Sequence, residues 1–302
     1  MQVSKTYWFA PGLNRFTGGI FLSEIAFTKM HGLGNDFILI NNLEYGLDTS
    51  YYADRAAQLC DRHFGIGADG LTVIERGEKA PFFMRIFNPD GSEAEMCGNA
   101  IRCLARYLWE RKMVGEQTFS LETGAGVKEV SLLLQGNLVQ AVEVDMGAPE
   151  LKSTDIPVSG PPRRVSDEAL SVEGENILFS AVSMGNPHCV IFVPSLDNIP
   201  WQRWGKLLEN DSLFPRRTNV EFVQILDQQE VKVKVWERGA GPTLACGTGA
   251  CAVVVAGVLS GRLRSPVQVN LPGGTLKITW EEGTGAIMEG PAEEVFNGSF
   301  TK

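Results

Sequence analysis

Runs of alternating apolar and polar residues, bounded by Gly, Pro, Asn and Asp, recur along most of the chain. Alternation with a period of two is typical of strands that bury one face. It predicts strands over residues 26–30, 36–42, 71–76, 83–88, 118–124, 138–147, 181–193, 220–227 and 231–239. Apolar residues at helical spacing predict four helices, over residues 49–62, 97–112, 201–210 and 246–260. Many strands with a few helices indicate the α+β class.

Two segments of the sequence resemble each other. Residues 94–106 read AEMCGNAIRCLAR and residues 243–255 read TLACGTGACAVVV. Each follows a predicted strand and a polar turn, and each places Cys and Gly just ahead of a predicted helix. The leading cysteines, Cys97 and Cys246, lie close to half the chain apart. We therefore predict a duplicated domain that contributes one thiol from each half.

The length of 302 residues suits two domains of about 150 residues each. Residues 1–24 mix Gly, Pro, aromatic and polar residues and predict an extension, with the first strand near Ile25. The first domain is then expected over residues 25–147 and the second over residues 148–289. A last strand near residues 290–300 is expected to return to the first domain.

Charge and hydropathy exclude two classes of partner. The chain has 27 Lys and Arg against 36 Asp and Glu, with no basic block, so we expect no nucleic-acid partner. The longest apolar run, residues 250–259, is much shorter than the roughly 20 residues that span a bilayer, so we expect no membrane partner. The first residues lack the pattern of a secretory signal, and a chain of this size needs no disulfides. Six free thiols in the cytoplasm are therefore predicted.

The two Cys-Gly turns are the sharpest chemical signal. A cysteine at the first turn of a helix faces unpaired backbone N–H groups and the positive end of the helix dipole, which lowers a thiol pKa. The next residues, Gly98–Asn99 and Gly247–Thr248, would let a ligand approach the backbone, and two such helix starts would bind a carboxylate. The other cysteines lie in apolar stretches and are predicted to be core residues: Cys60, Cys103, Cys189 and Cys251.

Metal and nucleophile chemistry are the competing interpretations. No C-x-x-C pair and no H-x-x-x-H pair occurs, so no metal site is predicted. A cysteine nucleophile needs a base, and His188 in GNPHC would serve Cys97 or Cys246. A single Cys–His pair would indicate a hydrolase, but it would leave the second Cys-Gly turn unexplained.

Polar residues in Gly- and Pro-rich turns complete the candidate site. Asn is a common turn former because it tolerates left-handed backbone. Together with Glu237 and Arg238, these asparagines are also the groups that would hold the ammonium and carboxylate ends of an amino acid. They are Asn35, Asn88, Asn186 and Asn219. No phosphate-binding loop and no motif for a pyridoxal phosphate lysine is present, so no cofactor is predicted.

The motifs together resemble the diaminopimelate epimerase family. They are KMHGLGNDF, DRHFGIGADG, FNPDGSEAEMCGNAIRC, MGNPHC, RTNVEFV and WERGAGPTLACGTGA, in that order between about residues 27 and 291. The resemblance implies a cofactor-independent epimerase that interconverts LL- and meso-diaminopimelate in lysine and peptidoglycan precursor biosynthesis. It implies two pseudo-symmetric domains, each a mixed or antiparallel sheet wrapped around a central helix, with the active site in the cleft between them. It also implies a homodimer.

The resemblance assigns a role to each candidate. Cys97 and Cys246 become the two acid–base thiols, and His188 and Glu237 match residues that tune them. Backbone amides of Gly98, Asn99, Gly247 and Thr248 would hold the reacting carboxylate. The substrate-contacting set comprises Asn35, Asn88, Asn186, Asn219, Glu237 and Arg238.

The sequence departs from the family pattern at three places. Gly70 stands where many members have Gln, which would remove one polar contact. Ala100 replaces a common Gly after CGN, and residues 1–24 have no counterpart.

Three other functions stay open at the level of sequence. An epimerase of proline or hydroxyproline would use the same two thiols, although GLGNDF and WERGAG carry contacts for a second amino-acid head group. An inactive binding protein would bind a ligand without turnover, and a hydrolase would tolerate loss of one cysteine. Two facing thiols also predict inactivation by air oxidation, reversed by a thiol reductant.

Overall fold

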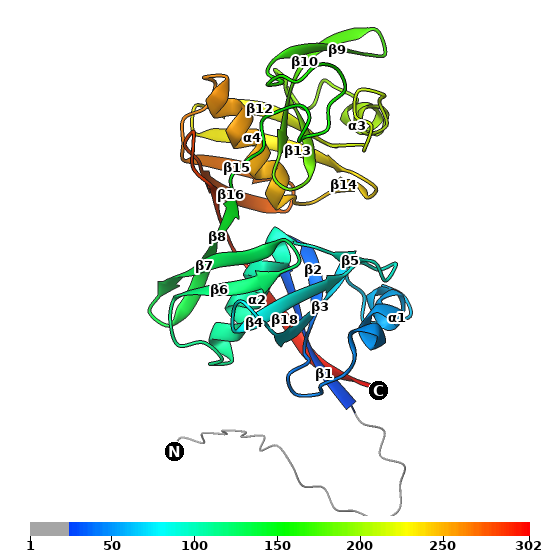
Figure 1. Cartoon of the computed structure of the whole chain (residues 1–302), viewed down its shortest axis with the longest axis vertical. Coiled ribbons are helices and arrows are strands. Elements are labelled where there is room, and N and C mark those ends of the chain that lie inside the picture. The colour runs from blue at the N-terminus through cyan, green and yellow to red at the C-terminus, as the bar shows by residue number, and fades with distance from the viewer. Residues whose placement is uncertain (1–23) are drawn as a thin grey trace, which may run out of the picture.

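The computed structural model describes residues 24–302. The predicted extension over residues 1–24 lies outside the described residues, except that Glu24 already begins the first strand. The described chain forms two halves stacked along the long axis of the molecule, and each contains a sheet and a central helix (Figure 1). Both halves therefore follow the α+β pattern predicted from the sequence.

The N-terminal half holds ten consecutive elements and the last strand of the chain. They are β1 (Glu24–Gly32), β2 (Asn35–Asn41), α1 (Thr49–Cys60), β3 (Gly70–Arg76), β4 (Phe82–Phe87), β5 (Glu93–Ala94), α2 (Gly98–Glu110), β6 (Thr118–Thr123), β7 (Gly126–Gln135), β8 (Leu138–Gly147) and β18 (Glu293–Thr301). β18 pairs antiparallel with β1, so the chain returns to the half in which it started.

The C-terminal half holds the remaining elements. They are β9 (Glu168–Val172), β10 (Glu175–Ser183), β11 (Pro187–Phe192), α3 (Trp201–Glu209), β12 (Asn219–Asp227), β13 (Glu230–Glu237), β14 (Gly241–Thr243), α4 (Gly247–Leu259), β15 (Val267–Leu271), β16 (Gly274–Thr279) and β17 (Ala286–Gly290). The residue boundaries predicted for the two domains stay a prediction.

Strand pairing repeats between the halves. β2 runs parallel to β3, and β4 runs parallel to β6. In the same way β11 runs parallel to β12, and β13 runs parallel to β15. The short strands β5 and β14 each fold back on the long strand before them and lead directly into a Cys-Gly turn. The repeat seen in the sequence is therefore a repeat of structure.

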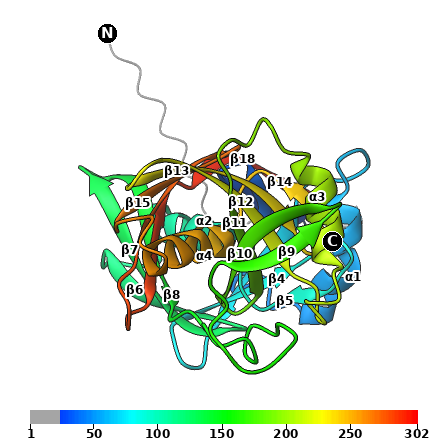
Figure 2. The same ribbon diagram turned by 90° about the horizontal axis from the view of Figure 1, so that it is seen from above.

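The helices occupy two kinds of position. α2 and α4 lie inside the sheets, and their buried side chains belong to one continuous apolar core that draws on both halves. α1 and α3 pack on the outer faces of their sheets over separate, smaller cores. Viewed from above, α4 lies at the centre with strands around it, and α3 lies outside (Figure 2). The central position of α4 follows from its composition, because α4 is apolar on every side.

The two halves are joined by backbone as well as by the shared core. β8 of the N-terminal half pairs antiparallel with β17 of the C-terminal half. This pairing places the start of α2 next to the start of α4. The duplicated Cys-Gly turns therefore meet at the junction of the halves.

The four predicted helices are all present within a few residues of the expected bounds. The single strand predicted over residues 181–193 is wrong, because β10 and β11 form a hairpin there. Gly185, with a φ of +92°, and the adjacent Asn186 form its turn. Seven strands were not predicted: β5, β7, β9, β14, β15, β16 and β17. Within residues 24–302, no helix is long and apolar enough to cross a membrane.

Candidate active site

Close packing of two glycines brings the thiol turns together. A Cβ on Gly247 would lie 3.7 Å from the Cα of Gly98 and 2.9 Å from the Sδ of Met288. A Cβ on Gly98 would lie 2.8 Å from the Cε of the same methionine. The glycines are therefore required by packing of α2 against α4 and Met288. The predicted reason, access of a ligand to the backbone, is at most part of the explanation.

Cys97 and Cys246 are the N-cap residues of α2 and α4, and both have extended backbone. Cys97 is half-buried, and its Sγ lies 3.8 Å from the Oδ1 of Asn35. Cys246 is only 6% exposed. Its Sγ accepts the N–H of Gly249 at 3.4 Å and lies 3.5 Å from the Oγ1 of Thr248. Both thiols thus sit where the sequence predicted them, at helix N-termini.

The predicted lowering of the thiol pKa values is wrong. Burial raises the pKa of the Cys97 thiol, while the backbone N–H groups of Ala100 and Asn99 lower it by less. Burial also raises the pKa of Cys246 well above its usual range, and the charges of Glu237 and Glu221 add to that rise. Desolvation of the charged form outweighs the helix N-terminus at both positions. The two thiols therefore favour the protonated form in this structure.

The charge of one carboxyl group acts on both thiols. Glu237, the last residue of β13, accepts a hydrogen bond from the Oγ1 of Thr243 at 2.6 Å. Burial raises the pKa of Glu237, and the Thr243 bond and the charge of His188 oppose that rise. The charge of Glu237 raises the pKa of Cys97 as well as that of Cys246. Its predicted role in tuning the thiols stays a prediction.

His188 is fully buried and makes no contact with a thiol. Its Nδ1 lies 2.7 Å from the Oε1 of Glu221, and its Nε2 lies 3.0 Å from the Oδ1 of Asn186. Both ring nitrogens therefore have partners other than a thiol, and no hydrogen bond joins His188 to Cys97 or Cys246. The described residues form no Cys–His pair of the kind that a hydrolase would need.

Glu221 is a site residue that the sequence interpretation missed. A Cβ on Gly249 would lie 2.7 Å from the Oε1 of Glu221 and 3.3 Å from the Sγ of Cys246, so carboxylate and thiol flank the same glycine. The Oε2 of Glu221 is buried and has no hydrogen-bond partner among the residues that the structure describes. The available signal was a carboxylate between the apolar residues Val220 and Phe222, in the first part of β12, which is buried.

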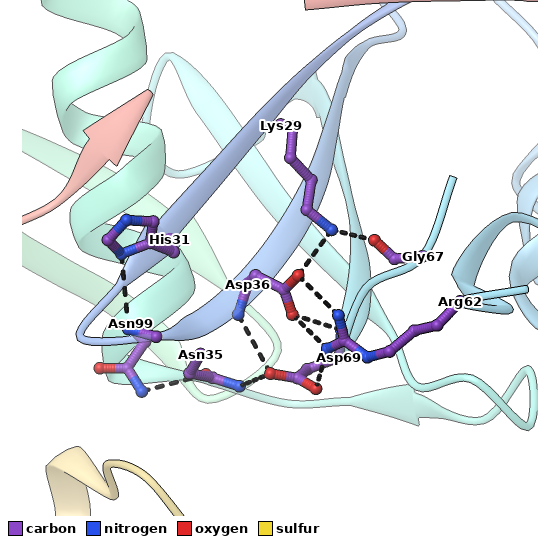
Figure 3. A network of polar contacts seen from close by, with 9 residues as sticks. Lys29, His31, Asn35, Asp36, Arg62, Gly67, Asp69 and Asn99 are labelled. Atoms are coloured by element: carbon purple, nitrogen blue, oxygen red, sulfur yellow. Dashed lines mark hydrogen bonds and ion pairs between the residues drawn. The ribbon is translucent and has the colours of Figure 1, made fainter. Parts of the chain in front are cut away.

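Asn35 is held in a polar network next to Cys97 (Figure 3). Its Nδ2 donates to the Oδ2 of Asp69 at 3.0 Å, and its Oδ1 accepts from the Nδ2 of Asn99 at 3.0 Å. Arg62 bridges the carboxylates of Asp36 and Asp69 at 2.6 and 2.7 Å. Asp36 in turn pairs with the buried Lys29 at 2.7 Å. Asn35 therefore belongs to the site, and its amide is tied to groups on the outer side of the sheet.

The other predicted substrate-contacting residues differ in burial and in their hydrogen-bond partners. Asn219 is buried, and its Oδ1 accepts the backbone N–H of Arg238 at 2.8 Å. The guanidinium of Arg238 is exposed and donates to the carbonyl of Arg216. Asn88 lies in an exposed turn, where its Nδ2 donates to the Oγ of Ser92 at 3.0 Å. Asn219 and Arg238 are thus coupled to each other, and the described contacts of Asn88 are local.

The remaining predictions concern residues away from the thiol turns. Cys60, Cys103, Cys189 and Cys251 are buried and free, as expected of core residues. Gly70 begins β3 opposite Phe37, where a Cβ would lie 3.3 Å from the phenyl ring. Residues 24–302 contain no group of three His, Cys, Asp or Glu that could hold a metal ion.

Similarity to known proteins agrees with the geometry. The family model described as diaminopimelate epimerase matches residues 27–152 and 180–295. A diaminopimelate epimerase of Pelotomaculum thermopropionicum is 55% identical over 274 residues, covering 91% of this chain and 98% of that protein. The enzyme of the same name from Desulforudis audaxviator is 51% identical, covering 91% and 99%.

Solved structures show the same fold at low sequence identity. A phenazine biosynthesis protein of the PhzF family from Bacillus anthracis has a TM-score of 0.68 at 16% identity, covering 93% of this chain and 100% of its own. A hydroxyproline epimerase from Agrobacterium vitis has a TM-score of 0.67 at 13% identity, covering 92% of each chain. The fold is thus shared with other epimerases, and the family match extends over most of the sequence. The chain belongs to the diaminopimelate epimerase family.

Proposed function

We propose that this protein interconverts LL- and meso-2,6-diaminopimelate without a cofactor, with Cys97 and Cys246 as the two acid–base groups. The observation that carries the proposal is the meeting of two duplicated helix starts, each capped by a cysteine, in a member of this family. A stereocentre held between two such groups faces one thiol on each side. We also propose that the protein acts in lysine and peptidoglycan precursor biosynthesis, in the cytoplasm, as a homodimer.

Inversion needs one thiolate and one thiol. The thiolate removes the α-proton from one face of the carbon, and the opposing thiol gives its proton to the other face. The product has the inverted centre, and the two sulfurs have exchanged their protonation states. The reverse reaction then begins from that exchanged state, so both directions use the same two groups.

Charge that develops on the substrate carboxylate needs hydrogen-bond donors. The first backbone N–H groups of α2 and α4 have no partner within their helices and lie at the positive ends of the helix dipoles. We infer that Gly98, Asn99, Gly247 and Thr248 supply them. Donors that are fixed before the reaction stabilise a transition state without reorganisation, typically by several kcal/mol for each donor.

Burial of the thiols has a chemical use in this mechanism. A poorly solvated thiolate is a stronger base, and the α-proton of an amino acid is very weakly acidic. The raised pKa values of Cys97 and Cys246 therefore suit proton abstraction better than a stabilised thiolate would. We infer that His188 and Glu237 tune this charge balance.

The distal amino-acid head of diaminopimelate would meet polar side chains around the thiols. We assign this contact to Asn35, Asn88, Asn186, Asn219, Glu237 and Arg238. The coupling of Asn219 to the backbone of Arg238 supports a shared role for those two residues. Substrates that lack the distal head would leave these groups unpaired, so simple amino acids are expected to be rejected strongly.

The test is turnover of LL-diaminopimelate in heavy water by the reduced protein. The expected result is meso product with deuterium at the inverted α-carbon, and no such product from Cys97→Ala or Cys246→Ala. A parallel panel with proline and hydroxyproline tests the alternative epimerase. Turnover of either in place of diaminopimelate would overturn the substrate assignment. Binding of diaminopimelate without exchange would instead indicate an inactive binding protein.

A further inference from the structure

A chain of side-chain hydrogen bonds runs across the N-terminal half and passes Cys97. Arg102 donates from its Nη2 to the Oδ1 of Asn99 at 2.8 Å. The Nδ2 of Asn99 donates to the Oδ1 of Asn35 at 3.0 Å, and the Nδ2 of Asn35 donates to the Oδ2 of Asp69 at 3.0 Å. Figure 3 shows the part of this chain from Asn99 to Asp69.

The two ends of the chain give it a direction. A guanidinium only donates hydrogen bonds, and a carboxylate only accepts them. An asparagine amide can face either way, and its neighbours decide which end points where. With a donor fixed at Arg102 and an acceptor fixed at Asp69, both amides have one orientation that satisfies every bond. In that orientation the oxygen of Asn35, and not its NH₂ group, faces the Sγ of Cys97 at 3.8 Å.

Each end is itself held in place. Arg102 is completely buried and also donates to the carbonyls of Gly98 and Pro291 at 2.9 and 3.1 Å. Among the described residues it forms no ion pair with a carboxylate, so its partners are these carbonyls, Asn99 and the Sδ of Met288 at 3.7 Å. Asp69 accepts the backbone N–H of Asp36 and the Nη2 of Arg62. Neither end is therefore free to turn away from its asparagine.

Asn99 also connects the chain to the second thiol turn. Its Nδ2 carries a second hydrogen, which points to the carbonyl of Ala245 at 3.3 Å. Ala245 directly precedes Cys246. The orientation of Asn99 thus serves the contact between the halves and the contact with Asn35 at the same time. A turned amide would break both.

We propose that Arg102 and Asp69 are positioning residues for the epimerase reaction, which hold the amide of Asn35 with its oxygen against the sulfur of Cys97. The role of these residues in the reaction rests on the proposed function, whereas the hydrogen-bond arrangement does not depend on it. An oxygen beside the sulfur accepts from the S–H and gives no hydrogen bond to the thiolate. The thiolate of Cys97 is then left a stronger base than it would be beside an N–H donor.

The test uses Asp69→Asn with Asp36→Asn as its matched control. Each variant removes one negative charge from the same network, but only Asp69 bonds the side chain of Asn35. The Asp69 side chain is 42% exposed, so the substitution leaves the core intact. The charged groups that act on Cys97, Glu237 from β13 and Arg102 from α2, are unchanged in both variants.

The measurement is the rate of alkylation of Cys97 as a function of pH, read separately for each cysteine by peptide mass spectrometry. In Asp69→Asn the variant amide cannot accept from both Asn35 and Arg62, so Asn35 turns in part and offers N–H to the sulfur. We expect the Cys97 profile to move to lower pH, with a several-fold higher rate at pH 8. Cys246 serves as the internal reference and stays unchanged.

Two further variants decide between orientation and charge. In an Asn35→Ala background, Asp69→Asn is expected to give no additional shift, because the effect passes through Asn35. Asp69→Glu keeps an acceptor and is expected to restore most of the original profile. Equal shifts in Asp69→Asn and Asp36→Asn, or an undiminished shift without Asn35, would overturn the proposal. Alkylation needs no substrate, so failure of the epimerase assay would leave this result readable and would count against the proposed function alone.

Discussion

The turns at Cys97 and Cys246 share a backbone but differ in what surrounds the sulfur. Cys97 is half-buried, lies beside the amide oxygen of Asn35, and has the charge of Arg102 one helical turn further along α2. Cys246 is almost fully buried, and the carboxyl groups of Glu237 and Glu221 both act on it. Duplication therefore reproduced the geometry of the turn, while the electrostatics of the two sites diverged.

This difference bears on a reaction that treats the two faces of one carbon alike. The proposed mechanism needs two groups of the same chemical type, and Cys97 and Cys246 at the repeated N-cap position would supply them. It also needs one of them charged and the other neutral at the start of each turnover. The unequal surroundings favour ionisation at Cys97 over Cys246, because negative charge near a thiol opposes its ionisation.

The largest expected effect breaks the pair itself. Cys97→Ser and Cys246→Ser should each lower kcat for inversion by about 10²–10⁴-fold, because a hydroxyl does not ionise near neutral pH and general acid–base groups contribute on this scale. The rate of meso-diaminopimelate formation measures it. Cys103→Ser and Cys251→Ser, in the same two helices, are the controls. The folded fraction of each control variant should be as active as the unchanged protein. Substantial inversion by Cys97→Ser or by Cys246→Ser would contradict a mechanism that uses both thiols.

The contact between the two turns should tolerate an added Cβ less well at Gly247 than at Gly98. In Gly247→Ala the new Cβ would meet the Sδ of Met288, whereas in Gly98→Ala it would meet the mobile Cε end of that side chain. Overpacking of this kind typically costs about 1–3 kcal/mol, and we expect Gly247→Ala at the upper end. Thermal or urea unfolding measures both. When Met288→Ala is combined with either glycine substitution, the two unfolding free-energy costs should not add up. Strictly additive costs would contradict a contact through Met288.

The unequal thiol pKa values predict an order of modification. Both pKa values are raised, so alkylation of each thiol accelerates as pH rises, and the more strongly raised Cys246 should accelerate at higher pH. At pH 8 we expect Cys97 to be modified several-fold faster than Cys246 in the substrate-free protein. Peptide mass spectrometry over pH 6–10 gives both profiles. Modification of Cys246 at the same pH as Cys97, or at a lower one, would contradict this order.

The smallest expected effect separates the two carboxylates. Glu237→Gln should move the alkylation profiles of both thiols to lower pH, because its charge acts on both. Glu221→Gln should move the profile of Cys246 alone by a few-fold in rate. Glu209→Gln, a buried carboxylate of the same half that bonds Trp236, is the control and should move neither. A shift of Cys97 in Glu221→Gln would show that the two sites are less separate than their contacts indicate.

Local patterns in the sequence were enough for the helices and for about half of the strands, although the ten-residue strand β7 was missed. The helices over residues 98–110 and 247–259 were predicted because each combines an N-cap turn with a long apolar periodicity. Strands β15, β16 and β17 contain only five or six residues each and were missed. In such short segments the alternation of apolar and polar residues is too brief to recognise. They become strands because their neighbours in the sheet supply the hydrogen bonds.

The sequence named candidate site residues but not the contacts that connect them. Cys97, Cys246, His188 and Glu237 stand out by residue type and motif. In the structure the charge of Glu237 acts on both thiols, and His188 acts on Glu237. Glu221 and Arg102 were not singled out. A buried charge is recognised only when its partners are known, and those partners lie far away in the sequence: His188 for Glu221, and Pro291 for Arg102.

The sequence by itself determined the family, the duplicated Cys-Gly turns and the chemical type of the two central groups. These properties depend on residue identity and on short spacings, which can be recognised directly in the sequence. Only the tertiary structure decided that both thiol pKa values are raised and not lowered. A helix start alone favours the thiolate, but the core that closes around the junction removes the solvent that a charged sulfur needs. Burial is a property of the whole fold, and at these two residues it outweighs the local helix effect.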